Sequence, residues 1–102
     1  MGIKPLKRFG QNYLNDKNTI EKIINRFSPD INDSVIEIGP GQGALTGKLE
    51  GKVKNYSAVE IDNRVIEKLQ KEFPKVKFFN RDFLKINFSD FGLPLPIRII
   101  GN

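Results

Sequence analysis

The sequence contains neither cysteine nor histidine among its 102 residues. The absence of cysteine excludes disulfide bonds and a thiolate nucleophile, and the absence of both residue types excludes a Cys/His zinc site. General base catalysis by histidine is excluded as well. A reaction that involves this chain must therefore draw its driving force from elsewhere, for example from a reactive cofactor, and we expect no bound metal.

Long apolar runs are also missing. No stretch approaches the roughly 20 residues that a membrane-spanning helix requires, and nothing resembles a signal peptide. Hydrophobic residues make up 38% of the chain and charged residues 28%, which is ordinary for a globular domain. We therefore expect one small cytoplasmic domain with no membrane partner, large enough for a core but short for a complete enzyme.

Acidic residues are outnumbered by basic ones, 12 against 17, which gives a net charge of +5. Residues 1–26 hold six basic and two acidic side chains and so contribute +4 of this charge. A basic leader favours a polyanion such as RNA, with Lys4, Lys7 and Arg8 as candidate RNA-binding residues. A solvated tail kept basic for solubility explains the same composition, so charge alone leaves both interpretations open.

The chain is organised around residues 35–46, which read V-I-E-I-G-P-G-Q-G-A-L-T. The first four residues predict a short buried strand, the glycines Gly39, Gly41 and Gly43 predict a sharp turn, and the residues from Ala44 onward predict a helix. Such a turn aims backbone N–H groups and the positive end of a helix dipole into a crevice that suits a nucleotide-like ligand. A glycine-rich turn without a ligand is the alternative interpretation.

The glycine pattern does not identify the ligand. It fits the G-x-G-x-x-A turn of dinucleotide-binding domains and equally the G-x-G-x-G turn of S-adenosylmethionine-dependent methyltransferases. Glu60 ends the next predicted strand, 17 positions after Gly43, and a carboxylate there accepts both ribose hydroxyls in either ligand class. A helix N-cap or a solvated strand end is the alternative role, and we prefer the helix cap for Asp62.

Hydrophobic periodicity predicts the helices. An amphipathic helix is expected between Asp16 or Asn18, as its N-cap, and Ser28-Pro29, where it ends. The helix after the glycine turn should be short because Gly47 and Gly51 interrupt it. A further helix is expected from about Arg64 to Phe73, with Pro74 as its stop.

Two more strands complete the pattern, one over residues 76–80 and one over 97–102. The segment between them is expected to be irregular, with Phe88 and Phe91 packed on the sheet. Asp82 follows the third strand, where it is placed to accept from an adenine amino group with Phe83 stacking beside it, although an ordinary turn aspartate fits the same position.

Strands that alternate with helices predict an α/β fold with a doubly wound, parallel, Rossmann-like sheet over residues 17–102, preceded by an extended basic arm over 1–16. The strand over 97–102 should lie beside the first strand, with its outer edge unpaired. An unpaired apolar edge favours self-association through that strand.

Five segments, in this order, resemble the ribosomal RNA adenine dimethyltransferases: F-G-Q-N-Y-L (9–14), E-I-G-P-G-Q-G (37–43), V-E-I-D (59–62), D-F-L (82–84) and the final G-N (101–102). The first segment and the G-P-G turn favour the branch that acts on small-subunit rRNA, although the antibiotic-resistance enzymes of large-subunit rRNA share most of the pattern. The resemblance implies S-adenosylmethionine as the cofactor and ribosomal RNA, or the precursor small ribosomal subunit, as the partner.

The resemblance also implies roles for single residues. Glu60 would hold the ribose hydroxyls and Asp82 would recognise the adenine. Asn102 would begin an Asn-Leu-Pro-Tyr motif, whose Asn side chain and Pro carbonyl hold the target N6 amino group, and it is the expected catalytic residue. The cofactor's sulfonium methyl is the electrophile, so no protein nucleophile is required. The implied cofactor-binding residues are Gln11, Asn12, Leu14, Gly39, Gly41, Glu60, Ile61, Asp82, Phe83 and Asn102.

The 102 residues also depart from the family pattern. They lack the Leu-Pro-Tyr that should follow Asn102 and the family's C-terminal helical domain. We therefore expect the cofactor-binding front part of an enzyme that dimethylates N6 of adenosines in rRNA, inactive in isolation. The alternative is a non-catalytic module that binds S-adenosylmethionine or RNA.

Overall fold

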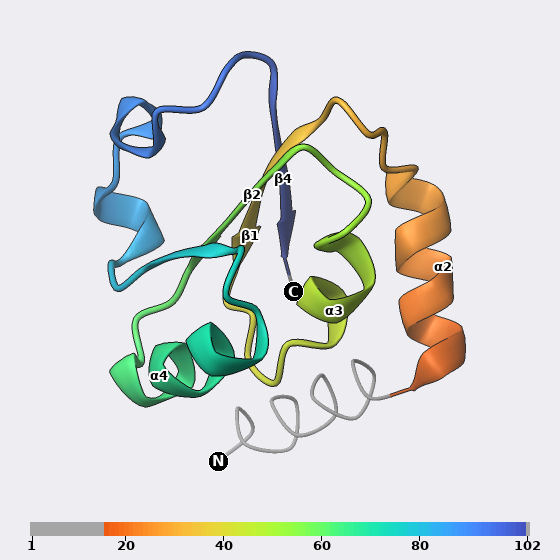
Figure 1. The fold of residues 1–102 in the computed structure, drawn as a ribbon, viewed down its shortest axis with the longest axis horizontal. Helices are drawn as coiled ribbons and strands as arrows, with labels where there is room; N and C mark the ends of the chain where they lie inside the picture. The colour runs from red at the N-terminus through yellow and green to blue at the C-terminus, as the bar shows by residue number, and fades with distance from the viewer. Residues whose placement is uncertain (1–15, 102) are drawn as a thin grey trace.

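A computed structural model describes residues 16–101 of the chain. Its centre is a sheet of four parallel strands in the order β3-β2-β1-β4 (Figure 1). The predicted α/β fold and the predicted position of the last strand beside the first are both confirmed. The strands are β1 (Ser34–Ile38), β2 (Asn55–Val59), β3 (Lys77–Phe79) and β4 (Ile97–Gly101). The helices are α2 (Lys17–Phe27), α3 (Ala44–Leu49) and α4 (Asn63–Glu72), with 3-10 helices η1 (Phe83–Lys85) and η2 (Phe88–Phe91).

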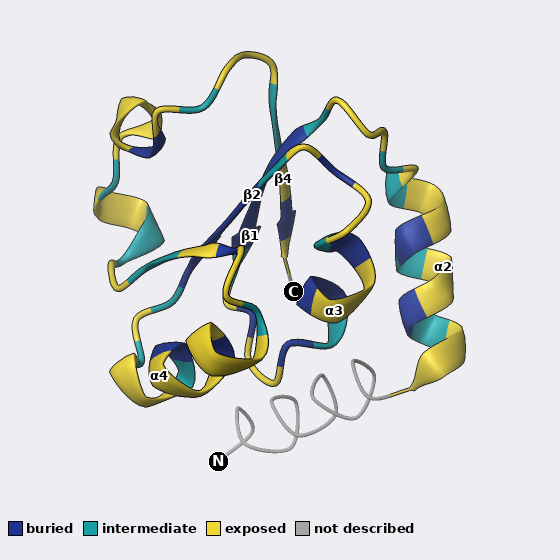
Figure 2. Ribbon diagram, viewed as in Figure 1, coloured by how far each residue is buried: buried dark blue, intermediate teal, exposed yellow. Residues whose placement is uncertain are grey.

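One face of the sheet carries the larger core, to which α2, α3 and the end of α4 contribute. Helix α2 begins because the Asp16 carboxylate accepts the Asn18 N–H at 2.8 Å, so Asp16, not Asn18, is the N-cap. It ends at Ser28, whose φ of 52° is left-handed. The buried stripe of α2 faces the sheet and its polar side faces solvent (Figure 2). This core comprises Ile20, Ile24, Val35, Leu45, Leu49, Val53, Tyr56, Ala58, Val76 and Ile100.

The other face carries a smaller core under η1 and η2, built on Ile36, Val59 and Phe91. Phe91 is buried as predicted and meets the Phe79 ring edge-on, with 4.6 Å between ring centroids. The prediction for Phe88 is wrong, since Phe88 is 45% exposed. Its ring leans on Phe83 and borders a shallow apolar hollow beside β4, so it lies at the margin of the sheet.

The predicted short helix is confirmed, since α3 ends at Leu49 before Gly51, but Gly47 does not interrupt it and lies inside the helix. A Cβ placed on Gly47 would contact the Phe73 ring at 3.5 Å, which is an ordinary packing distance. A Cβ on Gly43 would lie only 2.9 Å from Leu69 Cδ2 and 3.0 Å from the Phe73 ring. The glycine turn is thus fixed against α4 by close packing.

Arg98 joins three elements at the amino ends of the central strands. It projects from β4, donates to the Phe27 and Ser28 carbonyls at the end of α2, and pairs with Asp33 at 2.8 Å. Its guanidinium also lies 3.9 Å from the centroid of the Phe27 ring. The Asp30 N–H and then Arg98 hold the pKa of Asp33 below its usual range.

Strand β4 forms one edge of the sheet within the described residues, as predicted, with Ile99 43% exposed. Among the helices in 16–101, none is both long enough and apolar enough to cross a membrane. The basic arm predicted over 1–16 lies almost wholly outside the described residues, which begin at Asp16.

Candidate cofactor site

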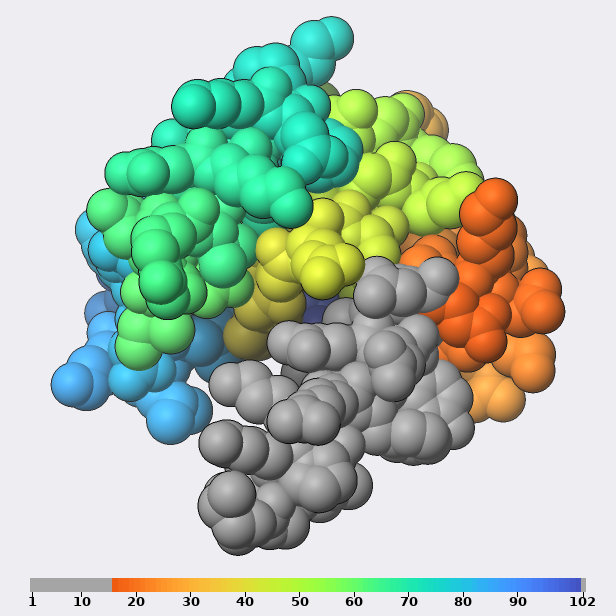
Figure 3. Space-filling view, turned by 90° about the horizontal axis from the view of Figure 1, so that it is seen from below, coloured from red at the N-terminus to blue at the C-terminus, as the bar shows by residue number. Residues whose placement is uncertain are grey.

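The glycine turn lies at the carboxyl end of β1. Gly39, Gly41 and Gly43 all have left-handed φ values, of 65°, 57° and 86°. Side chains other than glycine adopt this conformation at a cost, so the turn requires the residues that the sequence supplies. Seen from below, the turn (yellow) reaches the molecular surface beside α4 (green) (Figure 3).

A cavity of about 220 Å³ opens beside this turn, at the carboxyl ends of β1, β2 and β3. The meeting of these strand ends follows from the parallel sheet, since all four strands run in one direction. Five predicted cofactor residues line the cavity: Gly39, Glu60, Ile61, Asp82 and Phe83. The remaining lining residues are Ile38, Val59 and Arg81.

The two carboxylates of the cavity are oriented in the same way. The Asp62 N–H donates to Glu60 Oε2 at 3.0 Å, and the Leu84 N–H donates to Asp82 Oδ1 at 3.0 Å. Each carboxylate is therefore held by a backbone group two residues further along the chain. Asp82 also caps η1, so the turn role considered for it in the sequence is present together with its position in the cavity.

Asp62 is the N-cap of α4, as preferred from the sequence. Its carboxylate accepts the Arg64 N–H at 2.9 Å and pairs with the Arg64 guanidinium at 3.1 Å. These bonds to Arg64, the side-chain bond above all, hold the pKa of Asp62 below its usual range. Asp62 is thus committed to the helix, whereas Glu60 faces the cavity.

The apolar walls of the cavity come from Ile61 and Phe83. Ile61 is 71% exposed, which is high for an isoleucine, and Phe83 is half-buried against Phe88 with 6.2 Å between ring centroids. An exposed aliphatic side chain and an aromatic ring on one cavity offer the kind of surface on which a flat base packs.

Asn80 is a site residue that sequence reasoning missed. Its side-chain amide donates to the Glu60 carbonyl at 3.1 Å and to the Ile61 carbonyl at 3.0 Å. The Glu60 N–H in turn donates to the Phe79 carbonyl at 3.0 Å. Asn80 therefore joins the end of β3 to the segment that presents Glu60. An amide side chain directly before Arg81-Asp82 was the only signal in the sequence.

Arg81 and Asp90 form a second link that the sequence did not indicate. Arg81 lines the cavity, and its guanidinium contacts the Asp90 carboxylate at 3.2 Å. Asp90 also accepts the Asn87 N–H at 3.3 Å. Because both side chains are about half exposed, this pair orders the segment after Asp82 more than it stabilises the fold.

Glu37 lies under the glycine turn and is only 2% exposed. Its Oε1 accepts from the Thr46 hydroxyl at 2.5 Å and from the Tyr56 hydroxyl at 2.7 Å. Burial raises the pKa of Glu37, and the two hydroxyls oppose that rise. Burial and the nearby Glu37 charge also raise the pKa of Tyr56, which therefore keeps the proton that it donates. The network connects β1, α3 and β2 behind the turn.

The other predicted site residues are not brought to the cavity by the described structure. Gly41 is exposed in the turn and does not line the cavity. The remaining predicted positions lie outside the described residues and stay predictions: Lys4, Lys7, Arg8, Gln11, Asn12, Leu14 and Asn102.

Sequence comparison connects this site to a known family. The family described as ribosomal RNA adenine dimethylase matches residues 3–102. The chain belongs to this family. Within it, ribosomal RNA small subunit methyltransferase A of Prosthecochloris aestuarii is 36% identical over 96 residues, covering 94% of this chain and 37% of the relative. The protein of the same name from Chromobacterium violaceum is 42% identical over 100 residues, covering 96% of this chain and 38% of the relative.

Solved structures agree with the family assignment. The 23S rRNA methyltransferase ErmE aligns with a TM-score of 0.73 and 29% identity, over 84% of this chain and 35% of that protein. A dimethyladenosine transferase from Plasmodium falciparum aligns with a TM-score of 0.74 and 27% identity, over 85% of this chain and 32% of that protein. The chain thus spans 32–38% of the length of these relatives.

Proposed function

We propose that this chain forms the cofactor-binding part of an S-adenosylmethionine-dependent enzyme that dimethylates N6 of adenosines in small-subunit ribosomal RNA. The observation that carries the proposal is the meeting of Glu60, Asp82, Ile61 and Phe83 on one cavity beside the left-handed glycine turn. The names of the family and of the curated relatives supply the reaction class and the RNA.

The residues of the cavity fit the adenosine half of the proposed cofactor. A carboxylate accepts hydrogen bonds from two ribose hydroxyls at once, which suits Glu60, and a second carboxylate accepts from the adenine amino group, which suits Asp82. A Cβ built on Gly39 would meet no atom within 4 Å, so the space beside the turn is open to a ligand. Ile61 and Phe83 supply the apolar walls.

The protein's part in the reaction is binding and orientation. S-Adenosylmethionine, when bound, supplies an electrophilic sulfonium methyl group. Glu60 and Asp82 would fix the adenosine, and Asn102 would hold the target amine, as the family resemblance implies. With no nucleophilic residue required, the rate would depend on how well the amine is aligned with the methyl group.

The experiment that tests the cofactor assignment is calorimetry of this chain with S-adenosylmethionine and, separately, with NAD. We expect binding of S-adenosylmethionine and none of NAD at the same concentration. Both ligands carry an adenosine, so the comparison tests the remainder of the site and not the adenosine contacts alone. Tighter binding of NAD would overturn the assignment and return the glycine turn to the dinucleotide class.

A second candidate is an enzyme of large-subunit rRNA, which the likeness to ErmE favours. The two candidates differ in substrate and not in the cofactor site. Transfer of labelled methyl groups to precursor small subunits and to large-subunit rRNA, by the chain in its full-length context, separates them. Labelling of the large-subunit RNA alone would replace our first proposal by this one.

A further inference from the structure

The positive charge of the described residues is concentrated on two segments. Residues 48–54 and 68–77 carry seven lysines and two glutamates, a net charge of +5. The rest of the described chain carries seven basic and ten acidic residues, a net charge of −3. All seven lysines are exposed: Lys48, Lys52, Lys54, Lys68, Lys71, Lys75 and Lys77. We refer to these seven lysines together as the lysine surface.

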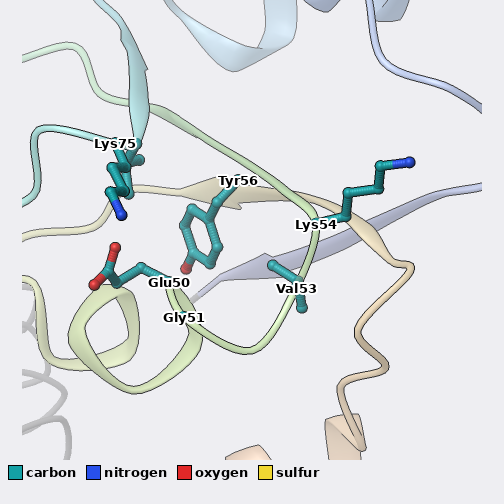
Figure 4. Close-up of a pocket in the computed structure, with 7 residues that line it drawn as sticks. Glu50, Gly51, Val53, Lys54, Tyr56 and Lys75 are labelled. Carbon is teal, nitrogen blue, oxygen red and sulfur yellow. The ribbon is translucent and has the colours of Figure 1, made fainter.

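The two segments lie against each other in the fold. Residues from both line one cavity of about 300 Å³, which Glu50, Val53 and Lys54 border on one side and Lys75 and Val76 on the other. Figure 4 shows Lys75 directed toward Glu50 across this cavity and Lys54 directed away from it. The acidic Glu50 makes the cavity itself a poor anion site, so the lysines around it, and not its interior, would contact a partner.

The lysine surface is distinct from the candidate cofactor site. Lys54 and Lys75 precede β2 and β3, at the amino ends of these strands, whereas Glu60 and Asp82 follow the carboxyl ends of the same strands. Among the ion pairs of residues 16–101, only Lys48 of the seven takes part, with Glu21 at 3.6 Å. The other six lysines form no ion pair within this part of the chain, so their charge is available to an external partner, apart from that of Lys75, which is directed toward Glu50.

We propose that the lysine surface binds the phosphate backbone of the ribosomal RNA at a place remote from the methylated adenosine. The inference rests on the proposed function, because that function supplies the class of polyanion. Lysine is a compact, strongly hydrated charge on a flexible side chain, which suits contacts with phosphates, and phosphate contacts carry no sequence information directly. The surface would hence strengthen and orient RNA binding without setting which adenosine is methylated.

A structural role for these lysines is the competing explanation. Lys48 and Lys71 lie in the last turns of α3 and α4, where cations stabilise the helix dipole. Lys52, Lys54 and Lys77 lie outside those helices, and Lys75 is left out because it is directed toward Glu50, so these three separate the two explanations. We choose these three for the test.

The test is binding of in vitro transcribed small-subunit rRNA to this chain and to the triple variant Lys52→Gln, Lys54→Gln, Lys77→Gln over a range of salt concentrations. We expect the variant to bind roughly tenfold or more weakly near 0.1 M salt, and the log–log salt slope to fall by about two to three units. The control changes Arg64 and Lys85 to Gln, two exposed basic residues that lie outside the two segments and outside the basic leader over 1–26. It removes two of the three charges and should change the affinity less than about twofold.

Equal losses in the test and control variants would overturn the proposal, since they would show a general effect of net charge. An unchanged salt slope in the test variant would overturn it as well. Replacement of the same three lysines by arginine should retain RNA binding, and thermal melting should be the same for all variants. Binding of poly-L-glutamate as tight as that of RNA would assign the surface to an acidic protein instead.

The RNA-binding test and the test of the cofactor site can give different results, so failure of one proposal can be told from failure of the other. Calorimetry with S-adenosylmethionine should give the same affinity for the chain and for the test variant, because the cofactor cavity lies at the other end of β2 and β3. If the chain binds no S-adenosylmethionine while the salt slope still falls in the variant, the proposed function fails and the RNA surface stands. If S-adenosylmethionine binds and the salt slope of RNA binding does not change in the variant, only the proposed role of the lysine surface is overturned.

Discussion

The two ends of the parallel sheet are built differently. At the amino ends of β1 and β4, the Arg98 guanidinium donates to two carbonyls at the end of α2 and to the Asp33 carboxylate. It also lies over the Phe27 ring. At the carboxyl ends the turn is left-handed, Ile61 and Leu84 are 71% and 88% exposed, and the two carboxylates of the cavity are held by backbone N–H groups. The polar groups around Arg98, at the amino ends of β1 and β4, stabilise the fold, whereas the carboxyl ends leave surface for a ligand. Substitutions at Arg98 and at the cavity should therefore separate stability from cofactor binding.

The largest effect is expected for methyl transfer. Residues 1–102 by themselves should transfer methyl groups to precursor small subunits at least roughly a thousandfold more slowly than a chain extended through Leu-Pro-Tyr and the remaining domain, because the target amine is not positioned. Transfer of labelled methyl groups measures this. Comparable rates for the two chains would show that the carboxyl end of these four strands suffices for catalysis.

Next in size is the effect of Arg98→Ala on stability. Loss of the bonds at the end of α2 and of the contact with Phe27 should lower the free energy of unfolding by about 2–3 kcal/mol, with no change in S-adenosylmethionine affinity under folding conditions. Urea denaturation and calorimetry measure the two quantities. Arg98→Lys is the matched control and should recover only part of the loss, since lysine lacks the planar fork. A loss of affinity equal to the loss of stability would contradict the separation of the two ends.

Glu60→Ala should give the opposite result. It should weaken S-adenosylmethionine binding by about 1–3 kcal/mol through the loss of a charge-assisted hydrogen bond, with little change in unfolding. Asp62→Ala, two residues further on, is the control and should affect binding far less because Asp62 caps α4. Unchanged affinity of the Glu60 variant in calorimetry would remove Glu60 from the site.

Asn80→Asp tests the link between β3 and the Glu60 segment. The carboxylate would face the carbonyls of Glu60 and Ile61 and could no longer donate to both, so we expect S-adenosylmethionine affinity to fall by about 1 kcal/mol. Asn80→Gln keeps the amide and should retain part of the affinity. If Asn80→Asp reduced only the melting temperature and not the affinity, Asn80 would be structural alone.

The smallest effect concerns Glu37, and its sign matters more than its size. Because burial raises the pKa of Glu37 above its ordinary value of 4.5, the folded chain holds this proton more tightly than the unfolded chain. Stability from this group is then present below about pH 4.5 and is lost as the pH rises through the folded-state pKa. Glu37→Gln should abolish that loss while it keeps an acceptor for Thr46 and Tyr56. Identical pH profiles of stability in the two proteins would contradict this.

Local patterns predicted most of the fold and part of the site. The spacing of apolar residues marked the helices and strands, and the glycines marked a turn whose φ values require them. Local patterns also placed Glu60 and Asp82 at strand ends, and the order of the strands brought them together. What depends on residues far apart was not visible: Arg98 meets Asp33 across 65 positions, and Asn80 meets Glu60 across 20.

The wrong expectations have related causes. Gly47 was expected to break α3 because its low helix propensity is a local property, whereas its closeness to Phe73 is a tertiary one. Phe88 was expected on the sheet because aromatic residues are usually buried, but its position in η2 directs it toward the margin beside β4. Sequence patterns give the type of element better than they give its surroundings.

The register of β4 has a consequence for how the chain folds during synthesis. Strand β1 pairs with β2 through Ser34 and Asn55, but its other neighbour, β4, begins only at Ile97. During synthesis, residues 34–79, which contain β1, β2 and β3, are made before β4. Until β4 follows, one edge of the hydrophobic β1 has no strand to pair with. The residue of β4 that pairs with Ser34 is Ile97, 63 positions further along the chain, and Arg98 follows it directly. Strand β4 thus carries both the backbone that pairs with β1 and the side chain that holds the end of α2, so neither contact can form before residues 97–101 have been synthesised.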